Sequence, residues 1–544
     1  MKSRRLISTL LAASLLASSV AGCSSSETTS STPSSSGGES SASSSETSTT
    51  EKVEVTYPIE GAPTFSMWMD LHNNIAPYAK NYGETEWAKE MEKRTGVHIE
   101  YEHPASGQAD ESLQVLLASG DYPDIICYLM TKYVGGAAKL YQDNVIYKLN
   151  DYMEYAPDLF AYLEANPEVD RQVKGDDGSY YLFPMIMEND SLLAMTMGPT
   201  IRKDYLDKVG MELPETISDW ETMLTAFKEE LGVEIPFVAQ GMDTLNRTFC
   251  RAYDVSYTFY PENKVIKYGP IEEGYREYLT TMADWYSKGL IDRNFSTNDK
   301  QALNSAMTTG AGSTVCAGGG QFGPYLQTAQ AANPEYDLVG AVYPTLEKGQ
   351  KVKYNGPYEY RGDGNCVITT ACENVEAAVQ YLNYGYTEEG HMFYNFGTEG
   401  VSYELIDGEP VYTDTVLHSP DGKTVAQAMS NYCRGNTSGP FVQDERYLLQ
   451  YYSTQQQKDA VEKWAVHDEE NRLTPPVVLT PEESSEYSSL MADINTYVDE
   501  MSLKFVMGQE SLDKFDEYVE SIKSMGIEDA IAIQQAALDR YYAR

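Results

Sequence analysis

The sequence predicts an α/β protein. From residue 51 onward, short apolar runs of strand length alternate with segments of helical periodicity. Glycine follows the early helical segments directly, as is usual where a helix ends. With 544 residues, 42% of them apolar, the chain is long enough to bury a large core.

Several elements can be assigned in order along the chain. The expected strands are residues 64–69, 97–101, 124–129, 313–317 and 338–342, and the expected early helices are residues 84–95 and 110–119. Ser218 and Glu221 have capping-box spacing, which predicts a helix from there to residue 230. Thr480 with Glu483 predicts a long helix closed by Gly508. A further helix is expected from Ser511 to Gly526, and residues 527–544 are helical throughout. Trp87, Trp220 and Trp285 lie in helical patterns and are expected in the core.

Charge excludes one class of partner. The chain has 40 Lys and Arg against 82 Asp and Glu, a net charge of -42. Because such a field repels phosphate backbones, we expect no nucleic-acid binding. The 43 tyrosines suit both cores and wet recognition surfaces, and composition alone does not separate these uses.

The first segment has the features of an export signal. Lys2, Arg4 and Arg5 precede an apolar run over residues 6–20, which is too short to span a bilayer. The run ends in Val-Ala-Gly-Cys, which resembles the bacterial lipobox. We therefore predict a lipoprotein signal peptide over residues 1–22 and a lipid on Cys23, with an ordinary secretory peptide as the alternative.

A tether is expected to follow the anchor. Residues 24–50 contain no large apolar side chain and consist mostly of Ser and Thr, so they cannot build a core. A random coil of this length spans roughly 30 Å. This organisation predicts a folded part held at the extracellular face of the cell membrane.

The cysteines show no metal-binding spacing. Seven cysteines occur. Cys23 is the predicted lipidation site, and the other six form no C-x-x-C pair and show no zinc-ligand spacing. Cys127, Cys316 and Cys366 lie in apolar, strand-like runs, which favours buried thiols over disulfides, although an exported protein can form disulfides. The six histidines are scattered, so no metal site is predicted.

Residues 118–126, ASGDYPDII, with the preceding TGVHIEYEHPA, resemble the N-terminal signature of family 1 extracellular solute-binding proteins, the capture lipoproteins of carbohydrate ABC importers. Further similar segments are IRKDYLDKVG, WYSKGLID, NFGTEGVSYE and the tail from residue 504. The resemblance covers residues 65–541. It implies a two-lobed periplasmic-binding-protein-like fold of type II, a hinge between discontinuous lobes, and a monomer that delivers an oligosaccharide to a membrane permease.

The resemblance and the composition together divide the chain. The predicted parts are 1–22 signal peptide, 23–57 lipidated cysteine and tether, 58–183 first part of the N-lobe, 184–360 first part of the C-lobe, 361–435 second part of the N-lobe, and 436–544 helical second part of the C-lobe.

Relatives often carry a calcium loop after the helix that contains Ala-Phe-Lys at residues 226–228. Here residues 229–234 keep no D-x-[DN]-x-[DN]-G spacing, which argues against a Ca²⁺ site.

Two other patterns point to no chemistry. Gly318, Gly320 and Gly323 spell G-x-G-x-x-G, but Asp337 begins the next strand instead of ending it, and Pro324 stands at the helix start. We interpret the run as a glycine turn that lets backbone approach the cleft or the other lobe. No G-x-S-x-G elbow or distinct carboxylate pair marks an enzyme, so neither catalytic residues nor cofactors are predicted.

Candidate ligand-binding residues follow from position. Trp68, Asp70 and Tyr128 end predicted strands, where ligands of open α/β sheets gather. Arg202, which begins a helix-like segment, is a further candidate, and its alternative role is an ion pair with Asp204. Trp68 is alternatively a core side chain. In the family interpretation further contacts come from Tyr257, Tyr360 and Arg361. Two other functions remain open: a surface glycoside hydrolase, which would release reducing ends, and a peptide-capturing protein.

Overall fold

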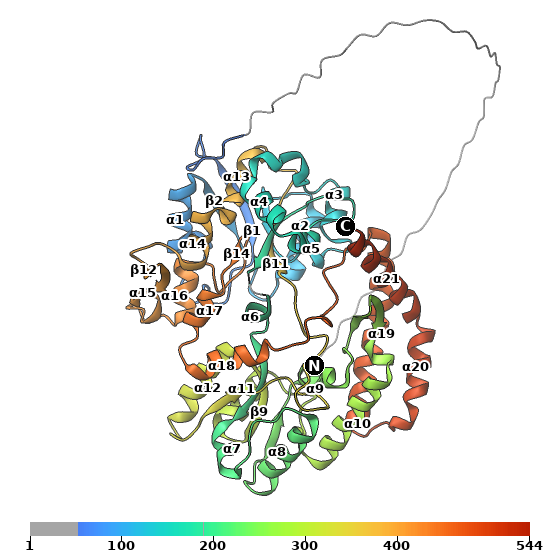
Figure 1. Cartoon of the computed structure of the whole chain (residues 1–544). Coiled ribbons are helices and arrows are strands. Elements are labelled where there is room, and N and C mark those ends of the chain that lie inside the picture. Colours follow the sequence, from blue (N-terminus) through green and yellow to red (C-terminus); the bar gives the residue numbers. More distant parts are fainter. Residues whose placement is uncertain (1–52, 189) are drawn as a thin grey trace, which may run out of the picture. The chain divides into compact units, whose positions relative to one another are not determined.

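The computed structural model describes residues 53–188 and 190–544, and Val53–Arg544 form one compact unit (Figure 1). The predicted signal peptide, Cys23 and residues 24–50 lie outside the described residues. The folded part begins before residue 58, the predicted boundary. The Tyr57 hydroxyl donates to the Gln380 carbonyl at 2.8 Å, and the Tyr57 ring packs on Tyr384.

The first lobe is built on a six-stranded mixed sheet in the order β14-β4-β11-β3-β1-β2. Its strands are β1 (Thr64–Met69), β2 (His98–Glu102), β3 (Ile125–Cys127), β4 (Phe183–Met187), β11 (Tyr360–Ile368) and β14 (Val442–Gln443). β1 runs parallel to both β2 and β3, whereas β11 is antiparallel to both of its neighbours. The carboxyl ends of β1 and β3 therefore lie at the same edge.

The second lobe is built on a four-stranded sheet in the order β10-β5-β9-β6. Its strands are β5 (Met197–Arg202), β6 (Ile235–Val238), β9 (Gly312–Gly318) and β10 (Leu338–Gly340). Two hairpins complete the described strands: β7 (Phe259–Glu262) with β8 (Val265–Tyr268), and β12 (Tyr403–Ile406) with β13 (Glu409–Tyr412).

The helices fall into chain segments that alternate between the lobes. Before β5 they are α1 (Glu86–Thr95), α2 (Ala109–Ser119), α3 (Gly136–Gln142), α4 (Pro157–Ala165), α5 (Pro167–Val173) and α6 (Asp190–Ala194). From β5 to β10 they are α7 (Lys203–Val209), α8 (Ile217–Glu229), α9 (Gly241–Phe249), α10 (Glu273–Lys288), α11 (Lys300–Thr309) and α12 (Gly319–Gln330). After β11 come α13 (Val375–Asn383), α14 (Glu388–Phe396), α15 (Asp414–Leu417), α16 (Val425–Tyr432) and α17 (Arg446–Tyr451). The last are α18 (Gln455–Trp464), α19 (Pro481–Val506), α20 (Phe515–Ser524) and α21 (Ile527–Ala543).

The chain passes between the lobes three times, so each lobe is discontinuous, as expected. Each passage differs slightly from its predicted position. β4 continues to Met187 because its five residues are all buried, so the first passage follows residue 187 and not 183. The second passage ends before Tyr360, one residue earlier than predicted, because Tyr360 already begins β11. The third passage lies beyond α17 and not at residue 436, because β14 still pairs with β4 in the first lobe.

Helix α18 returns the chain to the second sheet. Glycines make this packing close: a Cβ added to Gly198 would lie 2.4 Å from the Trp464 ring, and one added to Gly340 would lie 2.5 Å from the Ala460 Cβ. The Trp464 indole also donates to the Pro199 carbonyl at 3.1 Å. This segment lies between 120 and 266 residues from its partners in sequence and completes the second lobe.

Local signals mostly place the helix ends correctly. Gly96 and Gly120 adopt the left-handed conformation after α1 and α2, and Thr480 with Glu483 forms the capping box of α19. The predicted capping box of α8 is two residues too late in the sequence, because the N-cap is Thr216 and not Ser218, and its partner is Asp219. Trp87, Trp220 and Trp285 are buried at 3%, 0% and 0% exposure, which confirms them as core.

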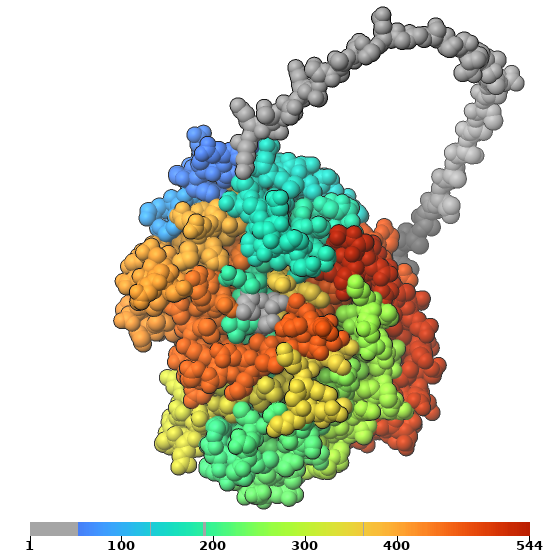
Figure 2. Space-filling view, viewed as in Figure 1, coloured from blue at the N-terminus to red at the C-terminus, as the bar shows by residue number. Residues whose placement is uncertain are grey.

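The C-terminal helices belong mainly to the second lobe, where α19 packs on α10. They also contact the first lobe, where the Asp176 carboxylate accepts from Arg540 Nε at 2.6 Å and from Arg544 Nε at 2.9 Å. Figure 2 shows the red helices against the cyan surface there. No helix among residues 53–188 and 190–544 combines the length and apolar character needed to cross a membrane.

Candidate functional site

A polar hollow of about 200 Å³ lies at the carboxyl edge of the first sheet. Its polar and aromatic lining comes from Asp70, His72, Tyr82, Tyr128, Arg434, Thr437 and Ser438. We call it the polar hollow. Two of the predicted ligand-binding residues, Asp70 and Tyr128, are brought together here.

Sheet register places these two residues side by side. Met69 at the end of β1 pairs with Cys127 at the end of β3, so the next residue of each strand, Asp70 and Tyr128, leaves the sheet at one edge. Ligands of open α/β sheets bind at such carboxyl ends. The Tyr128 hydroxyl donates to Asp110 Oδ1 at 2.8 Å, which fixes the ring at the rim.

Arg434 supplies the only guanidinium among the residues that line the polar hollow. It follows α16 and is 5% exposed. Its Nε donates to Thr437 Oγ1 at 2.8 Å, and the guanidinium also donates to the Ser438 carbonyl. Its Cζ lies 4.6 Å from the Tyr82 ring centroid and 5.1 Å from that of Trp87, so aromatic faces hold the cation in place.

The Tyr82 hydroxyl is buried and makes no hydrogen bond of normal geometry with a described residue, although the Thr437 side chain lies near enough to lower its pKa against the effect of burial. The side chain is 0% exposed, and it lines the polar hollow. Burial raises the pKa of Tyr82 to about 12, so the phenol stays protonated. A buried hydroxyl that lacks a partner costs free energy, and a ligand hydroxyl in the hollow would remove that cost.

Two further groups have shifted pKa values. Burial, with Arg434 nearby, lowers the pKa of His72 to about 4, and the ring accepts a hydrogen bond at Nδ1 from the Asn74 N–H at 3.2 Å. His72 is therefore neutral at pH 7. Desolvation raises the pKa of Asp70, while the Leu71 N–H and His103 oppose that shift. The hollow thus offers donors, acceptors and aromatic faces, the groups that recognise hydroxyls.

A second, larger hollow of about 470 Å³ lies between β11, α3, α5 and the segment that leads into α19. It contains no charged side chain, and its lining includes Tyr133, Tyr181, Tyr360 and Tyr487. The predicted residue Tyr360 lies here and not in the polar hollow. The segment around Val477 closes one side, so both lobes contribute to this space.

Two predicted ligand-binding residues, Trp68 and Arg202, are buried and line neither hollow. Trp68 is 5% exposed and packs edge-on to Tyr128 with centroids 5.6 Å apart, so it supports the hollow from the core. Arg202 is 1% exposed and forms two 2.7 Å hydrogen bonds to the Asp204 carboxylate. The alternatives left open by the sequence, a core tryptophan and an internal ion pair, are the arrangements observed.

Two other predicted residues line neither hollow. Tyr257 lies in the second lobe, half-buried, with the Arg251 guanidinium 5.0 Å from its ring centroid. Arg361 is half-buried in β11, opposite Met185. Their roles as ligand contacts stay predictions.

The sequence interpretation missed His72, Tyr82 and Arg434. His72 follows Asp70 by two residues, and that spacing after a strand was an available signal. Tyr82 opens a short 3-10 helix, and Arg434 lies 364 residues after Asp70 in a loop rich in Gly, Ser and Thr. Only the loop composition hints at a binding role, because loops carry binding residues.

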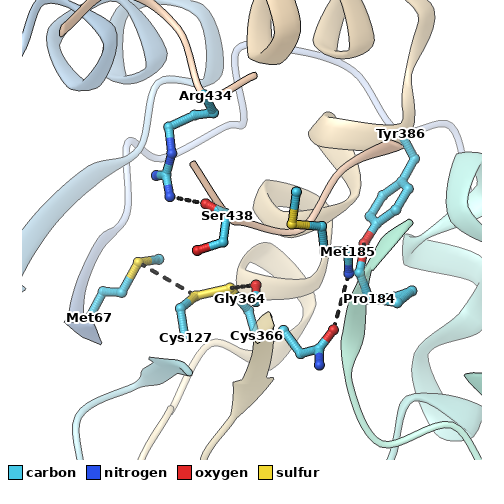
Figure 3. The surroundings of a disulfide bond; sticks show 10 residues. Met67, Cys127, Pro184, Met185, Gly364, Cys366, Tyr386, Arg434 and Ser438 are labelled. Carbon is cyan, nitrogen blue, oxygen red and sulfur yellow. Dashed lines mark hydrogen bonds between the residues drawn. A yellow bond between two sulfur atoms is a disulfide. The ribbon is translucent and has the colours of Figure 1, made fainter. Parts of the chain in front are cut away.

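A disulfide contradicts the preference for buried thiols. Cys127 and Cys366 are joined, with Cα atoms 4.1 Å apart (Figure 3). They pair across the antiparallel β3 and β11, which brings together residues 239 positions apart. Because strand register is not readable from a single sequence, this pairing could not be predicted. Cys250, Cys316, Cys372 and Cys433 are free.

Metal-ligand geometry occurs once in the described part of the chain. Ligand atoms of Glu188, His391 and Asp444 lie within 4.8 Å of one another. The Asp444 carboxylate, however, already pairs with His391 Nε2 at 3.2 Å and accepts from Arg446 Nε at 3.0 Å. Although burial acts in the opposite direction, these hydrogen bonds hold the Asp444 pKa well below its usual range. The arrangement is therefore an ion-pair network.

The segment after α8, where relatives often carry a calcium loop, is short. Five residues separate α8 from β6, fewer than the twelve of an EF-hand loop.

The glycine run acts as predicted, by allowing close approach. A Cβ on Gly319 would lie 2.7 Å from the Tyr452 ring, and one on Gly320 would lie 3.2 Å from the Tyr451 hydroxyl. Asp337 caps its own strand by accepting from the Leu338 N–H, and Gln456 donates to it at 3.1 Å. The carboxylate is thus used internally and not for a ribose.

Comparison with known proteins identifies the family. The model of the bacterial extracellular solute-binding proteins matches residues 75–392, more than half of the chain. The chain belongs to this family. Two curated relatives span most of this solute-binding protein: the fructooligosaccharide ABC transporter substrate-binding protein FusA of Streptococcus pneumoniae, 24% identical over 90% of this chain and 92% of its own, and the lipoprotein LipO of Bacillus subtilis, 22% identical over 80% and 86%.

Solved structures share the fold. The alginate-binding protein AlgQ2, crystallised without calcium, has a TM-score of 0.71 and 25% identity, covering 90% of this chain and 100% of its own. FusA in complex with kestose has a TM-score of 0.70 and 21% identity, covering 88% and 99%. The two-lobed fold predicted from the sequence is thereby confirmed.

Proposed function

We propose that this solute-binding protein captures a neutral oligosaccharide in the polar hollow and delivers it to an ABC transporter permease. The observation that carries the proposal is the buried, unpartnered Tyr82 hydroxyl beside Arg434, Asp70 and neutral His72. Such a set exchanges hydrogen bonds with ligand hydroxyls and rejects ligands that lack them. The relative FusA, which is named as the substrate-binding protein of a fructooligosaccharide ABC transporter, supports the choice of an oligosaccharide as the ligand.

Charge favours a neutral ligand over an anionic one. AlgQ2 is named for alginate, a polyanion, but this chain has a net charge of -42 and an Asp70 carboxylate in the hollow. Arg434 is already engaged with Thr437 and Ser438 and covered by aromatic rings. A polyanion would therefore meet net repulsion at this site.

A glycan panel tests this function. We expect a neutral oligosaccharide to raise the melting temperature, since a ligand at 100 times its Kd adds about 2.7 kcal/mol to stability. The bound sugar should be recovered intact. Release of new reducing ends, abolished by one carboxylate substitution, would place the protein among glycoside hydrolases, and binding of peptides but no glycan would make it a peptide-capturing protein.

Hinge closure explains how capture is signalled to the permease. Contacts from both lobes exist only when the lobes close on the ligand, so ligand shifts the population of open and closed forms. Tyr257 from the second lobe is the proposed complement to Asp70 and Tyr128 of the first lobe, and Tyr360 and Arg361 on β11 are proposed as further contacts from the first lobe. Scattering should show a more compact, monomeric particle at saturation, and an unchanged profile would count against closure.

The proposed location is the extracellular face of the membrane, with the lipid on Cys23 after removal of residues 1–22. The lipobox and the Ser/Thr-rich tract support it, as does the lipoprotein LipO among the relatives. Labelled fatty acid should enter the wild-type protein but not Cys23→Ala. Label retained in that variant would overturn the anchor assignment.

A further inference from the structure

The Cys127–Cys366 disulfide lies at the floor of the polar hollow. Cys127 lines the hollow, and both cysteines line a smaller space of about 30 Å³ directly behind it, together with Arg434 and Ser438. The disulfide therefore contacts the proposed ligand site and is not a remote staple. Figure 3 shows it between Met67, Gly364 and the Arg434 to Ser438 hydrogen bond.

The disulfide closes an irregular stretch of β11. The register of β11 against β4 shifts between Arg361 and Cys366, so the strand bulges here. Asn365, 1% exposed, holds the bulge, because its Nδ2 donates to the Gly362 carbonyl at 2.7 Å and its Oδ1 accepts from the Met185 N–H at 3.1 Å. These two hydrogen bonds of Asn365 fix the backbone of the bulge against β4.

On the β3 side the bulge is fixed to a wall of the hollow. The Tyr128 N–H donates to the Asn365 carbonyl at 3.0 Å, one residue beyond the disulfide on both strands. The disulfide thus locks the pairing from which Tyr128 projects. Without it, the position of Tyr128 depends on the non-covalent pairing of a three-residue strand, this one backbone hydrogen bond to β11, and the side-chain contacts with Asp110 and Trp68.

The bulge also supports the opposite wall. Gly364 has a φ of +78° and approaches the Arg434 loop so closely that an added Cβ would lie 2.4 Å from the Ser438 Cβ. Ser438 in turn accepts from the Arg434 guanidinium through its carbonyl. Contacts therefore run without a gap from the disulfide through Gly364 to Arg434.

We propose that the Cys127–Cys366 disulfide is a positioning element of the ligand site, which sets the spacing between Tyr128 and the Arg434 loop and makes binding sensitive to redox state. This inference rests on the proposed function for its binding consequence. Reduction by dithiothreitol transfers two electrons and two protons to the bridge, breaks the S–S bond into two thiols, and leaves the reagent as its cyclic disulfide. The reduced protein keeps its fold but loses affinity.

The test compares the wild type with Cys127→Ser/Cys366→Ser by hydrogen exchange without ligand. We expect faster exchange in residues 361–366 and also in residues 434–440, which carry neither cysteine of the bridge. Ile494→Ala, a buried site in α19 of the second lobe, is the matched control for general loss of stability. It should leave exchange in residues 434–440 unchanged.

Binding is then measured with kestose and with the other neutral oligosaccharides of the panel. The double variant and the reduced wild type should bind roughly tenfold more weakly, the scale of a misplaced hydrogen-bonding group, and reoxidation should restore the wild type. Unchanged exchange in residues 434–440, or the same change in Ile494→Ala, would overturn the positioning role. A wild type that binds no glycan refutes the proposed function instead, and the exchange result still decides the inference.

Discussion

Tyr82→Phe should change stability and affinity in opposite directions. The substitution removes one oxygen, which is 0% exposed and has no hydrogen-bond partner among the described residues. A buried polar group without a partner costs about 1–3 kcal/mol, so its removal should stabilise the free protein by about 1 kcal/mol. In a protein of this size that gain corresponds to a melting temperature higher by roughly 2 °C or less.

Ligand binding should weaken in the same variant. If the Tyr82 hydroxyl pairs with a ligand hydroxyl, its loss removes a net hydrogen bond of about 0.5–1.5 kcal/mol, which is roughly a two- to tenfold rise in Kd. Thermal unfolding measures the first effect, and calorimetric titration with the best glycan of the panel measures the second.

Tyr518→Phe provides a matched control. Tyr518 is also a buried tyrosine whose hydroxyl has no partner among the described residues, but it lies in α20, away from the polar hollow. It should show the same small gain in stability with no change in Kd. Equal Kd values for Tyr82→Phe and wild type, or a loss of stability in Tyr82→Phe, would refute the assignment of this hydroxyl to the ligand.

Three further outcomes are expected. Arg202→Met should lower stability by up to about 3–5 kcal/mol in urea unfolding, because the buried Asp204 carboxylate then keeps only the half-exposed Lys208, 3.5 Å away, as a cationic partner, and Kd should not change if the pair is structural. His72 takes up a proton near pH 4 in the folded protein but near pH 6.5 when unfolded, so stability should fall by up to about 3 kcal/mol as pH drops from 6.5 to 4. His72→Gln should flatten that part of the pH–stability curve, and an equal slope in the variant and the wild type would contradict the lowered pKa of His72. Gly198→Ala should cost roughly 1–3 kcal/mol, since its Cβ would overlap the Trp464 ring, and an unchanged melting temperature would mean that α18 does not pack there.

Local chemistry alone gave much of the fold. The apolar run Thr64–Met69 was readable as a strand because a strand paired on both sides inside a sheet is largely buried, and Gly96 marked a helix end because only glycine enters the left-handed region cheaply. The α/β class and the resemblance to a family follow from such repeated patterns. The capping box at α8 shows the limit of this reasoning, because several polar residues in a row allow more than one register.

The sequence also placed part of the proposed ligand site. Asp70 and Tyr128 were predictable because they follow strands, and the carboxyl ends of parallel strands meet at one edge. Trp68 and Asp70 are two positions apart, so strand periodicity alone would place both on one side of the sheet. Trp68 is nevertheless covered by Tyr128, whereas Asp70, just past the end of β1, lines the polar hollow. Which of the two reaches the hollow depends on what covers each face of the sheet, and that was outside the sequence.

What only the tertiary structure decided is the set of contacts between distant segments. Arg434 meets Tyr82 and Asp70 across more than 350 residues, and Cys127 meets Cys366 across 239. The sequence by itself indicated the strands, helices and caps and predicted an export signal, because those depend on neighbours a few positions away. Strand order and register, the disulfide and the walls of the hollow depend on which apolar faces pack together, and that choice is made by the whole folded chain.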